Sequence, residues 1–299
     1  MSAGGPAGEP ILEMGELTAR DVEALDRERT VVFITISPIE EHGPHLPLAT
    51  DIIEAGGVAR ALARRLAGER PGWRFLFYPA LPVGADCFIY PGSIEVRPRV
   101  VAALVHDIGL SFARSGFKKM LISSHHGGLR HNVALEAAAR RIARKTGARV
   151  ASLAGWLALD LYFRGGVAEY CRRAGDSDEA GKCLAVDCHA GAFETSEMLV
   201  LEPGLVRGGW ETLPPVLVPL LRLRLSSARD EAAGLGYFGA PALASAARGR
   251  EYLDFIVERV LPDVRRILDG EPVERRLPWK MRAAIGLARL HLAYQAWRG

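Results

Sequence analysis

The sequence has few cysteines and no long apolar run. Its 299 residues include only four cysteines, Cys87, Cys171, Cys183 and Cys188, and no CxxC pair occurs. So few thiols in so long a chain argue against a disulfide framework, and we interpret them as small buried apolar side chains. No apolar run approaches the roughly 18–20 residues needed to cross a bilayer. We therefore expect no membrane partner.

The chain also has little net charge. It carries 38 Lys and Arg against 35 Asp and Glu, a net charge of +3, and the basic residues are interleaved with acids. Without a basic stripe, nucleic acid is not an expected partner. Residues 1–10 lack the basic and apolar regions of a secretory signal. With 49% hydrophobic and 24% charged residues, the composition is typical of a globular protein, which we expect to be cytoplasmic.

Strand and helix patterns alternate along the first half of the chain. Thr30–Ser37 (TVVFITIS) is apolar and β-branched, which is typical of a strand buried on both faces of a parallel sheet. Further strands are predicted at Trp73–Tyr78, Lys118–Ser123 and Ala148–Leu153, and helices at Leu17–Arg29, Asp51–Leu66, Pro98–Ser115 and His131–Lys145. This alternation predicts an α/β fold, a three-layer αβα sandwich around a mostly parallel central sheet.

The pattern becomes less regular after residue 155. Gly175–Lys182 is predicted to be a polar loop, Pro214–Leu225 has no clear assignment, and Ala246–Leu268 is predicted to be a helix with a break or kink at Pro262. Leu277–Trp297 is predicted to form a further helix, which we expect to pack on the core rather than on a neighbouring subunit or a membrane surface. No linker divides the chain, so we expect one domain over residues 1–270 and a C-terminal helical extension over residues 271–299.

Acids and an imidazole follow the first long strand. The segment Ile39–Asp51 reads IEEHGPHLPLATD. Glu40 and His42 are two residues apart, so in extended backbone their side chains point to the same side. A Gly- and Pro-containing turn can return Asp51 beside them. Asp51 alone is most simply an N-cap, but two acids and an imidazole at one strand-to-helix turn favour a site for Zn, Mn or Fe.

A second segment with the same placement is Lys118–Asn132. A predicted strand runs into His125 and His126, which are followed by two glycines and a helix. The glycines allow the backbone to approach a ligand closely. We expect His131, on the first turn of that helix, to be exposed to solvent rather than to bind a ligand.

The third segment, Asp187–Glu197, reads DCHAGAFETSE. His189 lies in a Gly-containing turn, and Glu194 follows at the start of a helix, where its simplest role is to pair with the helix dipole. All three segments occupy loops of the alternating fold. This shared placement predicts that they form one site.

Together the three segments resemble the creatininase (creatinine amidohydrolase) family. The family motifs look like E-x-H-G-P-H-L-P-L-x-T-D, H-G-G-N and H-A-G-x-x-E-T-S, and they stand here as Glu40–Asp51, His126–Leu129 and His189–Ser196. The resemblance covers roughly residues 10–270 and extends over most of the chain. It implies a two-metal amidohydrolase on an α/β fold, assembled as a homo-oligomer, often a hexamer.

The resemblance also implies two metal positions. Glu40 and His126 would hold one divalent ion, His42 would hold the other, and Asp51 would bridge both. Creatininase completes the second position with a Glu two residues after the His of its H-G motif. This sequence has Gly128 at that place, so the family's ligand is missing.

Two residues of the third segment complete the implied site. Glu194 is the candidate for the missing ligand, and it serves either as a metal ligand or as a proton shuttle. His189 matches the acid/base histidine of the family. We therefore expect His189 and Glu194 to take part in catalysis.

Other positions differ from creatininase itself. Leu129 replaces the Asn of H-G-G-N, Ala185 replaces a Trp near the acid/base histidine, and Val83–Ser93 lacks a His of the corresponding family segment. We therefore do not expect creatinine as the substrate. The predicted function is hydrolysis of a non-peptide C–N bond, a cyclic amide or formamide in a small molecule, by a water that two divalent metals activate. The alternatives are a creatininase-like peptidase of peptide-cofactor maturation and a metal-binding protein without catalysis.

Overall fold

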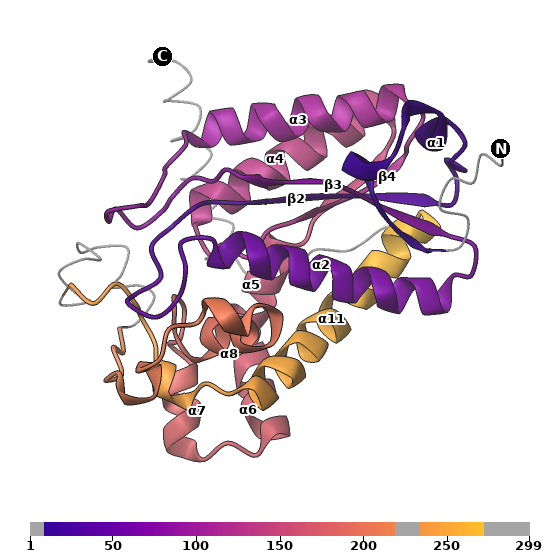
Figure 1. Ribbon diagram of the computed structural model, residues 1–299. Helices are drawn as coiled ribbons and strands as arrows, with labels where there is room; N and C mark the ends of the chain where they lie inside the picture. The colour runs from indigo at the N-terminus through magenta and orange to yellow at the C-terminus, as the bar shows by residue number, and fades with distance from the viewer. Residues whose placement is uncertain (1–8, 219–233, 272–299) are drawn as a thin grey trace.

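A five-stranded parallel sheet forms the centre of the protein. The computed structural model describes residues 9–218 and 234–271 (Figure 1). The strands are β1 (Ile11–Glu13), β2 (Thr30–Ser37), β3 (Arg74–Pro82), β4 (Lys119–Ser123) and β5 (Arg149–Ser152), in the order β1-β3-β2-β4-β5. Every pairing in this sheet is parallel, so the predicted sheet is confirmed. The short strand β1 was not foreseen.

Helices cover both faces of the sheet. They are α1 (Ala19–Glu23), α2 (Thr50–Glu69), α3 (Pro98–Arg114), α4 (Leu129–Thr146), α5 (Ala154–Phe163), α6 (Gly166–Ala174), α7 (Asp178–Leu184), α8 (Ala192–Leu201) and α11 (Ala246–Asp269). Helices α2 and α11 lie on one side of the sheet and α3 and α4 on the other, while α6, α7 and α8 form a group at one end (Figure 1). The predicted three-layer α/β architecture is confirmed.

The central strand β2 is buried along its whole length because it has a paired strand on each side and helices above and below. Its alternate residues enter two separate cores. Val31 and Phe33 pack with α2, α8 and α11, whereas Val32 and Ile34 pack with α3 and α4. This burial on both faces explains the nearly continuous apolar sequence of the strand.

Close packing fixes α8 against its neighbours. Gly57 of α2 faces Leu201 of α8, and Gly249 of α11 faces the backbone of Ser196. A Cβ atom on Gly249 would overlap the carbonyl oxygen of Ser196. The absence of side chains at these two glycines lets α8 lie close against both helices.

Two predictions about local structure were wrong in detail. The segment predicted as a loop, Gly175–Lys182, contains the start of α7, because the Ser177 side chain accepts a hydrogen bond from the Ala180 amide and caps the helix. The predicted helix at Ala246–Leu268 is present as α11, which continues through Pro262, so the break, one of the two alternatives predicted there, is absent. Pro262 lies on the exposed side of the helix, where water can satisfy the carbonyl that lacks its usual partner.

Some predictions fall on residues outside the described ranges. These are the helix at Leu277–Trp297, nearly all of the extension over residues 271–299, and most of Pro214–Leu225. Residues 214–218 are described and contain no helix or strand, although Val216 pairs with Gly239 in an isolated bridge. Among the described helices, none has both the length and the apolar character that a membrane span requires.

Candidate metal centre

The chain-distant segments meet at the carboxyl end of the sheet. Strands β2 and β4 are neighbours, so the loops that follow them lie side by side, as is usual for parallel strands. Glu40 and His42 come from the loop after β2, Asp51 from the first turn of α2, and His126 from the loop after β4. All four side chains are buried, with exposed fractions between 0% and 6%.

Asp51 lies between two histidines. Its Oδ1 atom is 3.6 Å from Nε2 of His42, and its Oδ2 atom is 3.3 Å from Nδ1 of His126. The simpler interpretation of Asp51 as an N-cap is wrong, because Ala49 is the N-cap of α2. One carboxylate therefore faces two separate groups of possible ligands.

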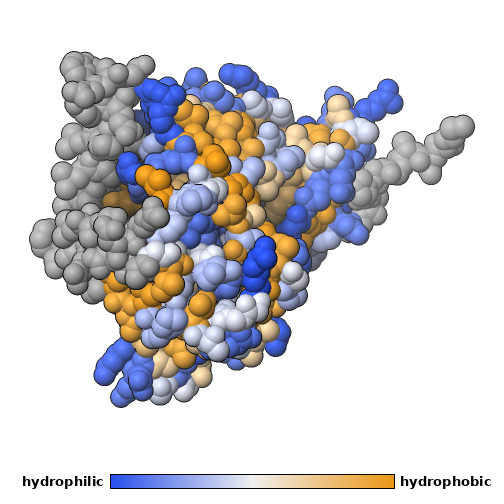
Figure 2. Space-filling model, turned by 60° about the vertical axis from the view of Figure 1, so that its left-hand side comes forward, coloured by the Kyte–Doolittle hydropathy of each residue, from blue (hydrophilic) through white to orange (hydrophobic). Residues whose placement is uncertain are grey.

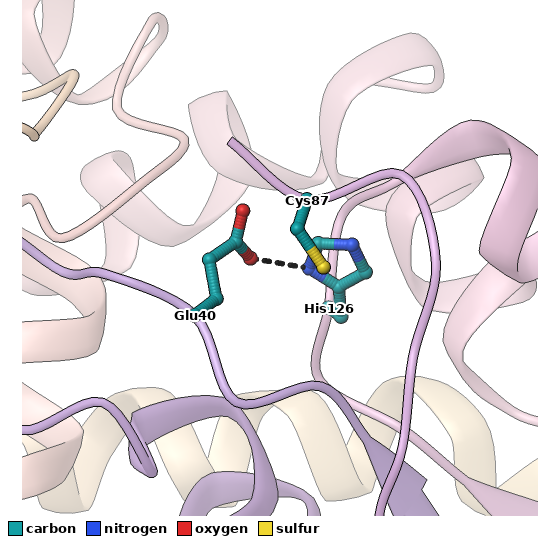
Figure 3. Close-up of side chains that lie close together, drawn as sticks. All are labelled: Glu40, Cys87 and His126. Atoms are coloured by element: carbon teal, nitrogen blue, oxygen red, sulfur yellow. Dashed lines mark ion pairs between the residues drawn. The ribbon is translucent and has the colours of Figure 1, made fainter. Parts of the chain in front are cut away.

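The first group contains Glu40, His126 and a residue that was not foreseen, Cys87. Glu40 Oε2 lies 3.0 Å from His126 Nδ1, and the Cys87 sulfur is close enough to both for one metal ion (Figure 3). The other nitrogen of His126, Nε2, donates to the carbonyl of Ala85 at 3.1 Å. Burial raises the pKa of the Cys87 thiol, so this thiol stays protonated unless a cation is near it.

The second group contains His42, His189 and Glu194, whose ligand atoms all lie within 4.8 Å of one another. Glu194 Oε2 lies 3.6 Å from His42 Nε2 and also accepts a hydrogen bond from the Ala190 amide. The segment around α8 thus brings Glu194 within reach of His42. The sequence could not show this, because it depends on how α8 packs.

Backbone carbonyls orient both central histidines. His42 donates from Nδ1 to the carbonyl of Glu40 at 3.0 Å, as His126 donates from Nε2 to that of Ala85. In each ring the opposite nitrogen is turned toward the carboxylates. Metal-binding histidines use this arrangement, in which one nitrogen donates to an outer partner and the other faces the metal.

The residues present fit divalent cations. Three buried atoms that face this centre, Glu40 Oε2, His42 Nε2 and Asp51 Oδ2, make no hydrogen bond of good geometry, and their only polar contacts are the ion pairs within the centre. Buried polar atoms without a partner are costly and rare, so they point to a missing ligand. Nitrogen and carboxylate oxygen are donors that Zn, Mn and Fe accept.

Electrostatics links the same residues. Burial opposes the charged form of His42, but Asp51 and Glu194 outweigh it and raise the pKa of His42 to about 10. Burial likewise opposes ionisation of Asp51, yet His42 and His126 hold the pKa of Asp51 well below its usual range. The positive charge that favours ionised Asp51 comes here from two imidazoles, and divalent cations would supply the same charge.

His189, the third member of the second group, is held in place by its neighbours. Its Nε2 atom donates to the carbonyl of Glu41 at 2.8 Å, and its ring lies 4.3 Å from the His42 ring and 4.6 Å from the Phe88 ring, measured between centroids. Neither Glu41 nor Phe88 was singled out in the sequence. Together they fix the orientation of the His189 ring.

His131 is buried, so the expectation that it faces solvent was wrong. Its Nδ1 atom accepts from the Ala85 amide at 3.3 Å, and its Nε2 atom lies 3.1 Å from Ser124 Oγ. Burial and the nearby His126 lower the pKa of His131 to about 3. A signal was present in the sequence, because His131 shares helical spacing with Leu135 and the other apolar residues of α4.

A third group of possible ligands was also missed. Glu54, His125 and Glu197 place one ligand atom each within 4.8 Å of the others. His125 was noted in the sequence only as part of its segment, and the two glutamates lie on the buried faces of α2 and α8. Helical periodicity identifies those positions as buried, but it does not show that they face each other.

A small cavity reaches this centre from the side of α5. Its lining combines the polar side chains of His125, His126 and Glu194 with apolar side chains that include Leu157 and Phe193. A bound molecule could therefore place a polar group at the candidate metal ligands and an apolar group against α5 and α8.

The comparisons with known proteins agree with this architecture. The family model described as creatinine amidohydrolase matches residues 15–263. The fold resembles a manganese form of creatininase, with a TM-score of 0.65, 22% identity, and coverage of 88% of this chain and 99% of that one. A putative creatinine amidohydrolase from Bacteroides fragilis gives a TM-score of 0.64 at 24% identity and covers 89% of this chain and 100% of its own. The chain belongs to the creatininase family of hydrolytic enzymes.

Among curated relatives, the similarity is to peptidases. The mycofactocin precursor peptide peptidase of Mycobacterium ulcerans is 30% identical over 267 residues, which cover 84% of this chain and 92% of the relative. The protein of the same name from Mycobacterium tuberculosis is 29% identical over 265 residues, 85% of this chain and 92% of its own. The creatinine amidohydrolase of Pseudomonas putida matches only 38% of this chain and 44% of its own, at 25% identity.

Proposed function

We propose that this protein hydrolyses a C–N bond with the help of two divalent cations, Zn, Mn or Fe. Glu40 and His126 would hold one cation, His42 and Glu194 the other, and Asp51 would contact both. Cations bound in this way polarise a carbonyl oxygen and lower the pKa of a shared water. The observation that supports this arrangement is that the two oxygens of Asp51 face two different histidines.

His189 is the proposed proton donor to the leaving nitrogen. The nitrogen released when a C–N bond breaks must gain a proton, and an imidazole can supply it near neutral pH. The hydrogen bond from Nε2 of His189 to the Glu41 carbonyl leaves Nδ1 for this transfer. Glu194, in the same group, serves as a cation ligand or carries a proton between water and the leaving nitrogen.

The proposed substrate is a peptide. The sequence motifs favoured a cyclic amide or a formamide, but the relatives that cover most of this chain are named as precursor peptide peptidases, whereas the creatinine amidohydrolase covers a minor part. The apolar wall formed by Leu157, Leu161, Phe193 and Tyr252 in the cavity suits an apolar side chain next to the cleaved bond. A cyclic amide or formamide remains the second candidate, on the strength of the family description.

One assay separates these candidates. Purified protein would be stripped with a chelator, reloaded with Zn²⁺ or Mn²⁺, and incubated with three kinds of probe: short peptides that contain apolar residues, N-formyl compounds, and creatinine. The measurements are new amino termini by mass spectrometry, formate, and ring opening. We expect new amino termini, and only in the reloaded protein.

Each other outcome has a defined meaning. Formate release or ring opening without peptide cleavage would replace the peptide by the second candidate. Stoichiometric metal binding without turnover on any probe would indicate a metal-binding protein and contradict the hydrolytic proposal. Turnover that survives complete removal of metal would contradict the two-cation arrangement.

We also propose that the protein is a homo-oligomer, a hexamer by family resemblance. The segment after β3 exposes two isoleucines near the candidate centre, Ile89 with 81% and Ile94 with 58% exposed. The part of the surface that Figure 2 shows has hydrophobic residues among hydrophilic ones. Contiguous exposed apolar patches mark contact surfaces between subunits, and these two isoleucines of one segment are candidates for part of such a patch. The molar mass in solution, measured by light scattering, tests this proposal.

A further inference from the structure

The third group of ligands lies outside the motifs that carry the family resemblance. The first motif ends at Asp51, the second begins at His126, and the third ends at Ser196. Glu54, His125 and Glu197 lie just beyond these limits, so the two-cation proposal gives them no role. They nevertheless come together from α2, from the loop after β4 and from α8.

The geometry of this group suits a single cation. His125 Nε2 lies 2.9 Å from Glu197 Oε2 and 3.8 Å from Glu54 Oε2. Zn–N and Zn–O bonds are about 2.0–2.2 Å long, so two donors on one tetrahedral ion lie roughly 3.3–3.6 Å apart. The distance from His125 to Glu197 is slightly shorter than this range, and the distance from His125 to Glu54 is slightly longer. Small side-chain adjustments would bring all three atoms to one ion.

Burial makes the group costly without a cation. Glu54 and Glu197 are each 0% exposed. Three of their four carboxylate oxygens have no hydrogen-bond partner, and the fourth, Glu197 Oε2, has only the ion pair with His125. One imidazolium balances at most one of two carboxylates. A divalent cation would neutralise both carboxylates and serve as the partner that their oxygens lack.

The small cavity also adjoins this group. His125 lines the same cavity as His126 and Glu194, so the group borders this cavity through its imidazole. Three protein ligands leave a coordination position for water or another ligand. The donors are one imidazole and two carboxylates with no thiol, a set that suits Mn, Fe or Zn.

We propose that Glu54, His125 and Glu197 bind a third divalent cation, in addition to the two proposed at Asp51. This site goes beyond the proposed function, because nothing in the two-cation reaction requires it. Its existence is tested by counting metal ions, and the count does not depend on turnover.

The test compares metal content between variants. Wild-type protein, stripped with a chelator and dialysed against Zn²⁺ or Mn²⁺, is expected to hold close to three ions per chain by mass spectrometry of the metal. Glu54→Gln and Glu197→Gln are each expected to hold close to two. The control Glu258→Gln changes an exposed glutamate of α11 that pairs with Arg173 at 3.1 Å, and it should keep the wild-type count.

Two further measurements keep the result decisive. Asp51→Asn should lose the ions of the Asp51 centre and keep one, which separates failure of the two-cation proposal from failure of the third site. If the glutamate variants do not fold, crystals of the wild-type protein grown with Zn²⁺ should show an anomalous peak between His125 and Glu197. Glu54→Gln and Glu197→Gln proteins that hold as many ions as the wild type, or no anomalous peak at this position, would overturn the proposal.

Discussion

The interior of the sheet and its carboxyl end are equally buried but differ in chemistry. In the interior, Val31, Phe33 and Leu121 are 0% exposed and pack in an apolar core. At the carboxyl end, Glu40 and His42 are also 0% exposed, yet they carry atoms without hydrogen-bond partners.

The difference shows where stability and chemistry are placed in this fold. Apolar burial in the interior contributes the free energy that orders the strands. Part of this free energy offsets the cost of bringing acids and imidazoles together at the carboxyl end. Variants at the two regions should therefore fail in different ways, the first by unfolding and the second by losing metal or activity.

Asp51→Asn is the change for which we expect the largest effect. The amide keeps the shape of the carboxylate but loses the charge that faces His42 and His126, so both cation positions are weakened. Activity should fall by at least about 10³-fold, together with the metal content of this centre. Steady-state assays and metal analysis of the same preparation check the result, and a fully loaded, active Asp51→Asn protein would contradict the bridging role.

His189→Ala should lower turnover by roughly 10²–10⁴-fold, the usual share of acid–base catalysis. The metal content should stay at the wild-type value, because the expected ligands are unchanged. Metal analysis distinguishes this from a ligand role, since His189 also lies within reach of His42 and Glu194. Loss of an ion in this variant would show that His189 is a metal ligand. It would contradict its assignment as a proton donor that does not bind metal.

Leu62→Ala tests the interior. Leu62 lies on α2 at 0% exposure in the core under the sheet, so its truncation leaves a cavity and should lower the free energy of unfolding by about 2–5 kcal/mol. Denaturant unfolding followed by circular dichroism measures this change. The remaining folded protein should keep its metal content, and a selective loss of metal would mean that the two regions are not independent.

Arg140→Ala should have the smallest effect. Arg140 pairs with Glu136 on the surface of α4 at 2.8 Å, and its side chain is 54% exposed. Solvent screens such pairs, so the free energy of unfolding should change by less than about 0.5 kcal/mol, with activity unchanged. A larger loss in the same unfolding experiment would show that the surface of α4 contributes to the candidate centre.

Much of the fold could be predicted because local patterns determine it. The strand at Thr30–Ser37 has the predicted bounds, because a run of apolar β-branched residues strongly favours a buried strand over a helix or a loop. Helix α7 was missed because its signal, a Ser cap in a polar segment, also suits a loop. His131 was misjudged because a polar residue on a first turn is usually exposed, whereas here the helix turns it toward β4 and the loop after β3.

The motifs by themselves indicated the residue types of the centre and the fold that carries them. Glu40, His42 and Asp51 are close in the chain, and their proximity follows from one strand-to-helix turn. Only the tertiary structure decided that Glu194 faces His42, that Cys87 joins Glu40, and that Glu54 meets Glu197. Those distances depend on how α8 packs against α2 and how neighbouring strands end, which are properties of the packed molecule that no local segment specifies.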